Sequence, residues 1–341
     1  MFKDKKILIT GGTGSVGKRM LTYFIESTNI EEIRIFSRNK EKQDRMRTTY
    51  KDPRIEYYIG DVRDFESVNS ALCEVDMVFH TASLKQVTTC ELYPMEAVTT
   101  NILGSNNVLN AAVQNKVRNI VMLSTDKAVN PIDAMGMTKA LMEKIAIAKM
   151  KDAIDTTVSI TRYGNVMASR GSVIPLFIKQ CKENVPITVT NPDMTRFLMS
   201  LDESVDLVLY ALKNAQNGDI FVQKTPASTI YNLAIAIHRI FNAKNKIEII
   251  GTRHGEKIHD TLVNREELAK AQDLGNFYRI PAEIHAWNYD NHFRNENMHK
   301  IEEYNSANTK RLTVDEVIEK LLSLDYVQTE LKTKEYVGVA E

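Results

Sequence analysis

The sequence predicts an α/β fold, built as a doubly wound parallel sheet with a smaller C-terminal lobe. Over the first half of the 341 residues, short β-rich runs alternate with longer segments of helical periodicity, which is typical of a parallel sheet covered by helices on both faces. A glycine-rich stretch directly follows the first of these runs, and beyond residue 165 the alternation loosens. We therefore expect a large domain over residues 1–165, to which later segments return, and a substrate-binding lobe formed mainly by residues 166–341.

Six short apolar runs are the predicted strands of the sheet. They are residues 7–10, 33–36, 55–59, 77–80, 120–123 and 158–161. Between them, residues 20–27, 95–114 and 136–150 carry apolar side chains every three or four positions, as helices packed on a sheet do. Together with the glycine-rich turn, this order predicts a Rossmann-type domain.

The smaller lobe has a less regular pattern. Prolines interrupt its short predicted strands, and a helix is predicted over residues 203–214. Residues 276–311 are polar and aromatic with little periodicity, so we expect an irregular surface excursion, a lid or a contact between subunits. Thr313 and Glu316 have the spacing of a capping box, which predicts a helix near the C-terminus.

Composition excludes several classes of partner. The 44 basic and 44 acidic residues cancel and are scattered, which predicts neither a nucleic acid nor a membrane surface as partner. No run approaches the ~20 apolar residues that span a bilayer. Three cysteines, Cys73, Cys90 and Cys181, lack CxxC spacing, so we expect neither a disulfide framework nor a structural metal. These features predict a cytoplasmic protein without a metal.

Three glycines form the first chemical motif. Gly11, Gly14 and Gly17 lie between the first predicted strand and the first predicted helix, in the pattern GxxGxxG. The absence of side chains permits a tight turn and lets backbone N–H groups at the helix N-terminus approach a pyrophosphate. A simple turn is the alternative, but the strand–turn–helix context favours dinucleotide binding.

The end of the second predicted strand favours NADP over NAD. An NAD site normally offers an acidic residue about 20 positions after the glycines, whereas Ser37 and Arg38 occupy that place here, with Lys42 nearby. Arginine can bind the 2′-phosphate of NADP through two prongs; a solvated basic turn is the alternative. Asp61 and Val62, which follow the third predicted strand, would flank the adenine.

Two further segments follow predicted strands and therefore emerge at the carboxyl edge of the sheet. The first begins with His80, interpreted as a packed strand residue, and ends with Lys85, which either reaches a substrate or cofactor oxygen or is solvated. The second contains Asp126 and Lys127. A neighbouring carboxylate and amine can shift each other's pKa toward the range for acid–base catalysis; an ordinary surface ion pair is the alternative.

These motifs resemble a known family. The glycine pattern, the run STDK at 124–127 and Lys139 are similar to extended short-chain dehydrogenases/reductases, in particular the nucleotide-sugar 4,6-dehydratases. Longer strings resemble the UDP-N-acetylglucosamine 4,6-dehydratase (5-inverting) subgroup; they lie at 84–87, 124–129, 162–175, 194–197 and 251–257. The resemblance implies a UDP-sugar substrate, bound NADP and a homo-oligomer, either a dimer or a hexamer.

The resemblance also implies a reaction cycle. A hydride passes from sugar C4 to NADP⁺, Lys127 removes the C5 proton, and Asp126 protonates the departing C6 hydroxyl. The hydride then returns to C6, and C5 regains a proton on the opposite face. Thr125 would hydrogen-bond the C4 oxygen, and Lys139 would hold the nicotinamide ribose. The expected product is UDP-2-acetamido-2,6-dideoxy-β-L-arabino-hex-4-ulose, a precursor for surface or capsular polysaccharide.

Met135 departs from the usual family pattern, in which a tyrosine takes the C4 hydroxyl proton. A thioether cannot do so, and Asp126, Lys127, Lys85 or a water molecule remain as candidates. Two other functions stay open: a UDP-sugar 4-epimerase acting on UDP-glucose or UDP-N-acetylglucosamine, and a non-catalytic NADP-binding sensor.

The predicted site therefore has three groups of residues. The catalytic group is Thr125, Asp126, Lys127, Lys139 and Lys85, with Met135 at the tyrosine position. The cofactor group is Gly11, Thr13, Gly14, Ser15, Val16, Gly17, Ser37, Arg38, Lys42, Asp61, Val62, Ala82, Lys85, Asn101 and Lys139. The substrate group is Lys85, Thr125, Tyr163, Asn165, Val173, Arg196, Arg253 and Glu256. The resemblance implies that Asn165, Arg196 and Arg253 bind the diphosphate, for which arginines are suited, and that Glu256 contacts the uridine ribose.

Overall fold

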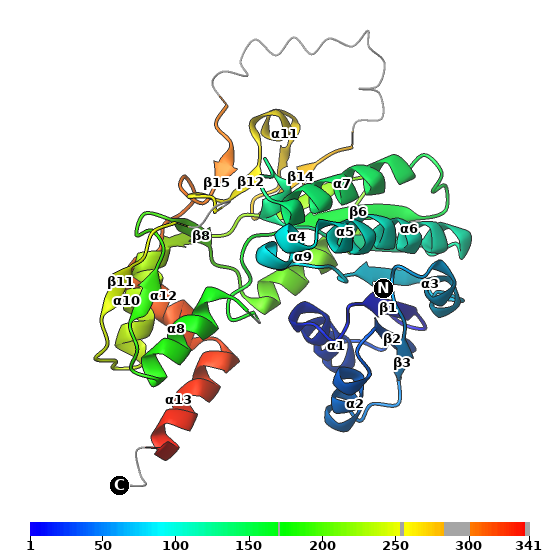
Figure 1. The fold of residues 1–341 in the computed structure, drawn as a ribbon. Helices are drawn as coiled ribbons and strands as arrows, with labels where there is room; N and C mark the ends of the chain where they lie inside the picture. Colours follow the sequence, from blue (N-terminus) through cyan, green and yellow to red (C-terminus); the bar gives the residue numbers. More distant parts are fainter. Residues whose placement is uncertain (170, 253–255, 283–300, 338–341) are drawn as a thin grey trace. The chain divides into compact units, whose positions relative to one another are not determined.

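The computed structural model describes residues 1–169, 171–252, 256–282 and 301–337 (Figure 1). The chain forms two compact units. The first unit comprises Met1–Tyr163, Leu201–Gln223 and Leu262–Glu303, and the second comprises Gly164–Ser200, Lys224–Thr261 and Tyr304–Glu341. The assignment of UDP-sugar binding to the smaller lobe stays a prediction.

A single large sheet organises the first unit. Within the described residues it has nine strands in the order β13-β14-β9-β6-β5-β4-β1-β2-β3. Their bounds are β1 Lys6–Thr10, β2 Glu32–Ser37, β3 Ile55–Ile59, β4 Met77–His80, β5 Asn119–Leu123, β6 Thr157–Arg162, β9 Ile220–Gln223, β13 Gln272–Asp273 and β14 Phe277–Ile280. The pairings from β3 to β9 are parallel, whereas β14 is antiparallel to both β9 and β13. The six predicted strands and the α/β class are confirmed, with an antiparallel edge that was not predicted.

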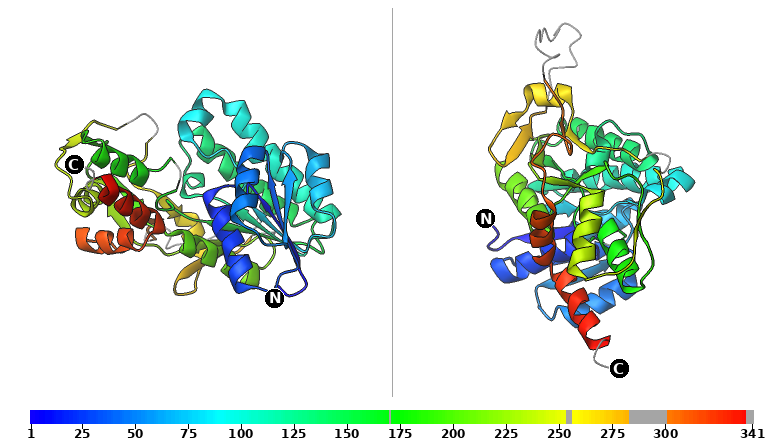
Figure 2. Two further views of the ribbon diagram at one scale, coloured as in Figure 1. Left: turned by 90° about the horizontal axis from the view of Figure 1, so that it is seen from below. Right: turned by 90° about the vertical axis from the view of Figure 1, so that its left-hand side faces the viewer.

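Helices cover both faces of this sheet. They are α1 Ser15–Ser27, α2 Lys40–Thr49, α3 Phe65–Ala71, α4 Val87–Leu92, α5 Pro94–Ala97, η1 Val98–Leu103, α6 Gly104–Gln114, η2 Asp126–Ala128, α7 Ala134–Lys149, α9 Leu201–Asn214 and α11 Arg265–Lys270. Helix α1 contacts α9, whereas α3 and α7 both contact α6. The left view of Figure 2 shows helices on both sides of the strands of this unit. The predicted doubly wound arrangement is therefore confirmed.

The predicted single helix over residues 95–114 is wrong in detail. The segment consists of α5, the π-helical turn η1 and α6. Asn101 lies in η1 and is fully buried. Its side chain bonds the backbone N–H and carbonyl of Leu84, at 2.7 and 3.0 Å, and the Thr138 hydroxyl, at 3.0 Å. These bonds satisfy a polar side chain inside the helix layer, as a buried amide requires; apolar periodicity alone did not reveal them.

The prediction of an irregular segment over residues 276–311 is also wrong in part, because β14 lies within it. Phe277 of β14 stacks on Tyr210 of α9, with ring centroids 4.1 Å apart and an interplanar angle of 17°. Four residues are too few to show a clear alternation of apolar and polar positions, so the strand was not recognised. Residues 283–300 of the predicted excursion lie outside the described residues.

The second unit has its own small sheets and helices. Its elements are α8 Val173–Lys182, β7 Ile187–Val189, β8 Thr195–Phe197, β10 Ala227–Thr229, α10 Ile230–Ile240, β11 Ile247–Ile249, β15 Tyr304–Asn305, α12 Val314–Leu322 and α13 Asp325–Val337, and β12 Thr261–Val263 begins at its boundary. Strand β8 pairs with β10, and β7 pairs with β11. Phe177, Ile237 and Val317 belong to its apolar core. The predicted capping box of Thr313 and Glu316 opens α12 and is confirmed.

Among the residues described, no helix is both long enough and apolar enough to cross a membrane.

Replacing Phe24 with alanine should lower the free energy of unfolding of the first unit by about 3–5 kcal/mol, because it empties a large buried volume. Phe24 is fully buried, and its ring lies 5.2 Å from that of Phe2 and 5.5 Å from that of Phe79. Ile154→Ala is the control, since Ile154 is 92% exposed. Urea unfolding monitored by circular dichroism measures both variants, and equal midpoints would contradict the prediction.

Candidate active site

The glycine-rich turn joins β1 to α1. At two of its positions the backbone leaves room for glycine only. Gly11 has a φ of +63°, and a Cβ there would lie 2.8 Å from the Ala82 Cα. A Cβ at Gly17 would lie 2.6 Å from the Gly12 Cα. Gly14 is the N-cap of α1 and offers no side chain to cap it. No side chain therefore caps the N-terminus of this 13-residue helix with a hydrogen bond, which suits a pyrophosphate.

Polar side chains cluster at the end of β2. The buried Ser37 hydroxyl accepts a hydrogen bond from Gln43 Nε2 at 3.0 Å. Arg38 is half exposed and lies 3.6 Å from the Asp61 carboxylate. Arg63 donates to the same carboxylate at 2.7 and 2.9 Å. Burial raises the pKa of Asp61. The hydrogen bonds and charge of Arg63, together with the charge of Arg38, lower it by more than burial raises it, so the pKa lies below its ordinary value.

The remaining predicted cofactor residues lie on nearby elements of the same unit. Val62 is buried, and a Cβ at Gly104 would lie 2.7 Å from its Cγ2. The Ala82 N–H donates to the Thr10 hydroxyl at 3.3 Å. Lys42 lies in the first turn of α2, where its N–H is capped by the Asn39 side chain at 2.8 Å. Their contacts with a cofactor, like those of Thr13, Ser15, Val16 and Asn101, stay predictions.

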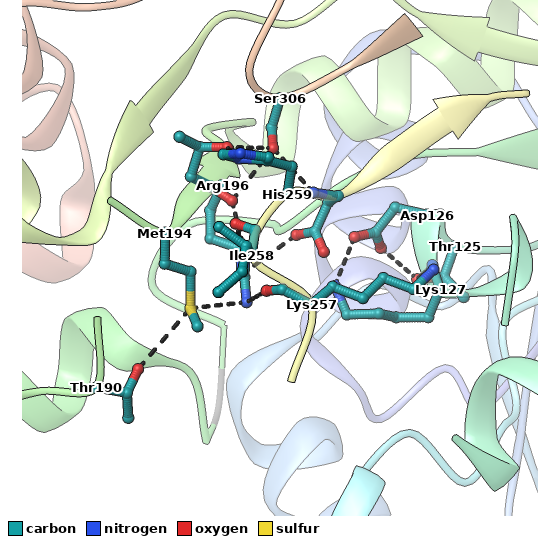
Figure 3. A network of polar contacts seen from close by, with 12 residues as sticks. Thr125, Asp126, Lys127, Thr190, Met194, Arg196, Lys257, Ile258, His259 and Ser306 are labelled. Carbon is teal, nitrogen blue, oxygen red and sulfur yellow. Dashed lines mark hydrogen bonds and ion pairs between the residues drawn. The ribbon is translucent and has the colours of Figure 1, made fainter. Parts of the chain in front are cut away.

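Asp126 and Lys127 form an ion pair at the carboxyl end of β5. Lys127 Nζ lies 2.7 Å from Asp126 Oδ2. The Asp126 side chain is 3% exposed and that of Lys127 is 18% exposed, and Figure 3 shows the two side chains directed toward one another. Because the carboxylate is almost fully buried, this pair is not an ordinary surface ion pair, for which the median contribution is small.

Thr125 orients the acidic partner. Its hydroxyl donates to Asp126 Oδ1 at 2.6 Å and accepts from the Lys127 N–H at 3.3 Å, at the start of η2. Asp126 Oδ1 therefore accepts a hydrogen bond from Thr125, and Oδ2 accepts one from Lys127. For the predicted hydrogen bond to the sugar C4 oxygen, Thr125 could act as donor only by releasing Asp126.

Lys139 lies deep in the unit rather than at its surface. Its Nζ donates to the Leu123 carbonyl oxygen at 2.5 Å and contacts Met142 Sδ at 3.2 Å. Burial lowers the pKa of Lys139 to about 8, although the charge of Glu143 opposes this shift. The predicted interpretation of His80 agrees with its surroundings: its ring nitrogens contact the hydroxyls of Thr10 and Ser105 at 2.8 and 2.9 Å, and burial lowers its pKa to about 3.

Met135 packs in a small apolar cluster. It is 7% exposed and lies with Cys90 and Ala97, which are fully buried. One position further along α7, a Cβ at Gly136 would lie 2.3 Å from the Lys127 carbonyl oxygen. The first turn of α7 therefore rests directly on the backbone of the acid–base pair. Lys85 is exposed, in the loop after β4.

Sequence reasoning missed a buried charge network beside this pair. Glu143 of α7 accepts hydrogen bonds from Ser124, at 2.5 Å, and from Arg162, at 3.1 and 2.6 Å. Arg162 also donates to both carboxylate oxygens of Glu267 in α11, at 2.9 and 3.0 Å. The one available signal was that Lys139 and Glu143 are charged, four residues apart, within a predicted helix that packs on the sheet.

In the second unit, the Arg196 guanidinium is bound to its own surroundings. It donates to the backbone carbonyls of Thr195, Lys257 and Ile258 at 2.7, 2.9 and 3.2 Å, and its Nε lies 3.3 Å from the Asp260 carboxylate. Figure 3 shows Lys257 and Ile258 beside the Arg196 side chain. Nη2 also contacts Met194 Sδ at 2.9 Å, so a diphosphate would have to displace at least one of these contacts.

The other predicted substrate residues are spread over both units. Tyr163, in the first unit, accepts a hydrogen bond from the Asp126 N–H through its backbone carbonyl at 3.1 Å, and burial raises the pKa of its hydroxyl. Asn165 is exposed, Val173 opens α8, and Glu256 is half-buried. Arg253 lies outside the described residues. All these substrate contacts stay predictions.

Comparison with known proteins identifies the family. The family model described as "Polysaccharide biosynthesis protein" matches residues 7–282, and the model described as "Polysaccharide biosynthesis protein C-terminal" matches residues 286–328. The chain belongs to the polysaccharide biosynthesis protein family. The predicted membership in the extended short-chain dehydrogenases/reductases and the predicted link to polysaccharide synthesis are confirmed, and the dehydratase subgroup is not decided by these matches.

Relatives place this member of the polysaccharide biosynthesis protein family among enzymes that modify nucleotide sugars. A curated protein of Rickettsia bellii named UDP-glucose 4-epimerase is 60% identical over 97% of this chain and 99% of the relative. The crystal structure of Pen from Bacillus thuringiensis is 36% identical, covers 95% of this chain and 99% of Pen, and has a TM-score of 0.86. DesIV, a dTDP-glucose 4,6-dehydratase of Streptomyces venezuelae with NAD bound, is 20% identical, covers 74% of this chain and 86% of DesIV, and has a TM-score of 0.68. The likeness to DesIV shows the fold alone.

The buried Lys139 predicts a specific pH dependence of stability. Its pKa is lowered from 10.5 to about 8 in the folded chain, so between these values the unfolded chain binds more protons, and stability rises with pH. The free energy of unfolding of the wild type should therefore increase relative to Lys139→Met between about pH 8 and about pH 10, by at most about 1.4 kcal/mol per pH unit. Urea unfolding of both proteins across this range is the measurement; a constant difference would contradict the prediction.

Proposed function

We propose that the protein oxidises a UDP-hexose at C4 and then removes water across C5 and C6, as in 4,6-dehydration of UDP-N-acetylglucosamine with inversion at C5. The observation that carries this proposal is the buried Asp126 carboxylate, held 2.7 Å from Lys127 Nζ at the end of β5. Elimination needs an acid at one sugar carbon and a base at its neighbour. Adjacent residues at one strand end supply both groups.

The glycine-rich turn fits a nicotinamide dinucleotide. The Cβ positions of Gly11 and Gly17 are filled by backbone, and no side chain caps the N-terminus of α1 with a hydrogen bond, which fits the binding of a pyrophosphate there. A bound nicotinamide would supply the hydride chemistry, removal from C4 and return at C6. The NAD of DesIV supports this class of cofactor, and Arg38 at the end of β2 favours NADP within it.

The roles of Asp126 and Lys127 in water loss follow from their protonation states. Lys127 as a neutral amine takes the C5 proton, and Asp126 as a carboxylic acid gives a proton to the C6 oxygen as the C6–O bond breaks. The pair then consists of an ammonium and a carboxylate, which fit the 2.7 Å distance between Lys127 Nζ and Asp126 Oδ2. One proton shift from Lys127 to Asp126 restores the reactive forms. Met135 cannot accept the C4 hydroxyl proton. Because Asp126 starts as the acid and Lys127 takes the C5 proton, Lys85 or a water molecule accepts the C4 hydroxyl proton and passes it to solvent. C5 regains one proton from solvent on the opposite face.

UDP-sugar 4-epimerisation is the second candidate, and the names of the relatives support it more directly than they support dehydration. Rickettsia bellii and Rickettsia felis relatives, 60% and 57% identical, are both named UDP-glucose 4-epimerase. An epimerase removes the C4 hydride and returns it to the other face without loss of water. It would need a base at the C4 hydroxyl but no acid at C6.

Product analysis separates these functions. Purified protein with NADP or NAD is incubated with UDP-N-acetylglucosamine, UDP-glucose and UDP-galactose in turn. Loss of one water in the mass spectrum supports dehydration, whereas a new isomer of unchanged mass, resolved by NMR, supports 4-epimerisation and overturns our proposal. Cofactor binding without turnover of any of the three sugars would favour the non-catalytic sensor.

Replacing Gly11 with alanine should weaken cofactor binding by at least about tenfold, because a Cβ would collide with the Ala82 backbone and the turn would be displaced. Gly275→Ala is the matched control: Gly275 also has a positive φ, of +78°, but no atom lies within 4 Å of its Cβ position. Isothermal titration with NADP and NAD measures both variants. Equal affinities would refute the assigned role of the turn.

Asp126→Asn and Lys127→Met should each slow water loss by at least about 100-fold, since each removes one proton-transfer group. The control changes are Asp152→Asn and Lys149→Met, at a partly exposed ion pair 3.2 Å apart in the same unit. Initial rates with UDP-N-acetylglucosamine are the measurement. Near-normal turnover in both active-site variants, with epimerised product, would instead support the 4-epimerase.

A further inference from the structure

We infer that Glu143 and Ser124 together position the Asp126–Lys127 acid–base pair, although neither touches a reacting atom. The inference rests on the proposed function and adds two positioning residues to it. Glu143 Oε1 accepts the Ser124 hydroxyl at 2.5 Å and Arg162 Nε at 3.1 Å, and its Oε2 accepts Arg162 Nη2 at 2.6 Å. Ser124 is the residue that leads from β5 into the pair.

Burial excludes water from the three side chains, so they depend on one another for hydrogen bonds. Ser124, Glu143 and Arg162 are 3%, 4% and 2% exposed. A buried carboxylate is tolerated only when it is paired and hydrogen-bonded. Arg162 supplies the charge and Ser124 supplies a further hydrogen bond to Oε1. The Ser124 hydroxyl is therefore held by Glu143, whose carboxylate is itself held by Arg162.

The backbone transmits this constraint over two residues. The Ser124 N–H donates to the Thr161 carbonyl at 2.7 Å, and the Asp126 N–H donates to the Tyr163 carbonyl at 3.1 Å. Thr125, between them, is extended, with φ −151° and ψ 156°, and its hydroxyl holds Asp126 Oδ1. The hydrogen bond of the Ser124 side chain thus fixes the backbone where the chain leaves β5. The direction of that backbone determines where the Asp126 carboxylate points. Small displacements of a catalytic group can cost about 100-fold in rate.

Ser124→Ala tests the inference, with Ser159→Ala as its matched control. Ser159 is 2% exposed on the neighbouring strand β6, and its hydroxyl donates to the Ile120 carbonyl at 3.4 Å. We expect Ser124→Ala to lower kcat for water loss by about 10- to 100-fold, with KM and cofactor affinity unchanged, and Ser159→Ala to keep wild-type kcat. Equal kcat values for the two variants would overturn the inference while leaving the proposed function in place.

Glu143→Gln keeps an acceptor for Ser124 and should retain more turnover than Glu143→Leu, which offers none. Thermal unfolding of each variant accompanies the kinetics. If turnover follows only the loss of thermal stability across the four variants, the residues are structural and the inference is wrong.

A second readout does not depend on turnover. Acetylation of Lys127 by acetic anhydride in the unliganded protein, quantified by peptide mass spectrometry, should become severalfold faster in Ser124→Ala than in the wild type and stay unchanged in Ser159→Ala. Absence of turnover in the wild type would defeat the proposed function, whereas unchanged Lys127 labelling in Ser124→Ala would defeat this inference separately.

Discussion

The arrangement of the candidate site depends on one buried arginine between two carboxylates. Arg162, at the end of β6, joins Glu143 of α7 to Glu267 of α11. Moving such charges out of water costs several kcal/mol per ion, and only close pairing offsets that cost. The network therefore has little freedom: the positions of α7, α11 and the end of β6 must satisfy it at the same time. Glu143 extends the constraint to Ser124 and also opposes the effect of burial on the nearby Lys139.

Close backbone contact is the second constraint on the site. At Gly11 the glycine-rich turn approaches the loop after β4, and at Gly136 the helix α7 approaches the carbonyl of Lys127. In both places a methyl group would overlap main-chain atoms, which cannot rotate away as a flexible side chain can. The turn and the acid–base pair are thus located by steric exclusion, whereas the buried charges fix the helix that supports them.

The parts of this fold that sequence predicted are those with local signals. The strands from β1 to β6 are apolar runs, the turn at Gly11 has a fixed spacing, and the helix after Thr313 begins with a capping box. The parts that were missed depend on partners far apart in sequence or on very short elements. Arg162 and Glu267 are 105 residues apart, and β14 has only four residues.

The candidate site divides in the same way. Residue identity and position after a strand were enough to single out Asp126 and Lys127. Identity could not show that the Arg196 donors are already used, because the Lys257 carbonyl that accepts one of them is 61 positions away. It also could not show that Thr125 is committed to Asp126, because the direction of a hydroxyl depends on the backbone of η2.

Met135 has a consequence for how the protein can change through evolution. Its side chain occupies an apolar cluster with Cys90 and Ala97, so a tyrosine that followed the same path would bury its hydroxyl among groups that offer it little hydrogen bonding. An unsatisfied hydroxyl of this kind costs about 1–3 kcal/mol. Substitution by tyrosine alone would therefore lower stability before it could contribute to chemistry. Introducing a tyrosine base at this position would therefore require compensating changes at Cys90 or Ala97.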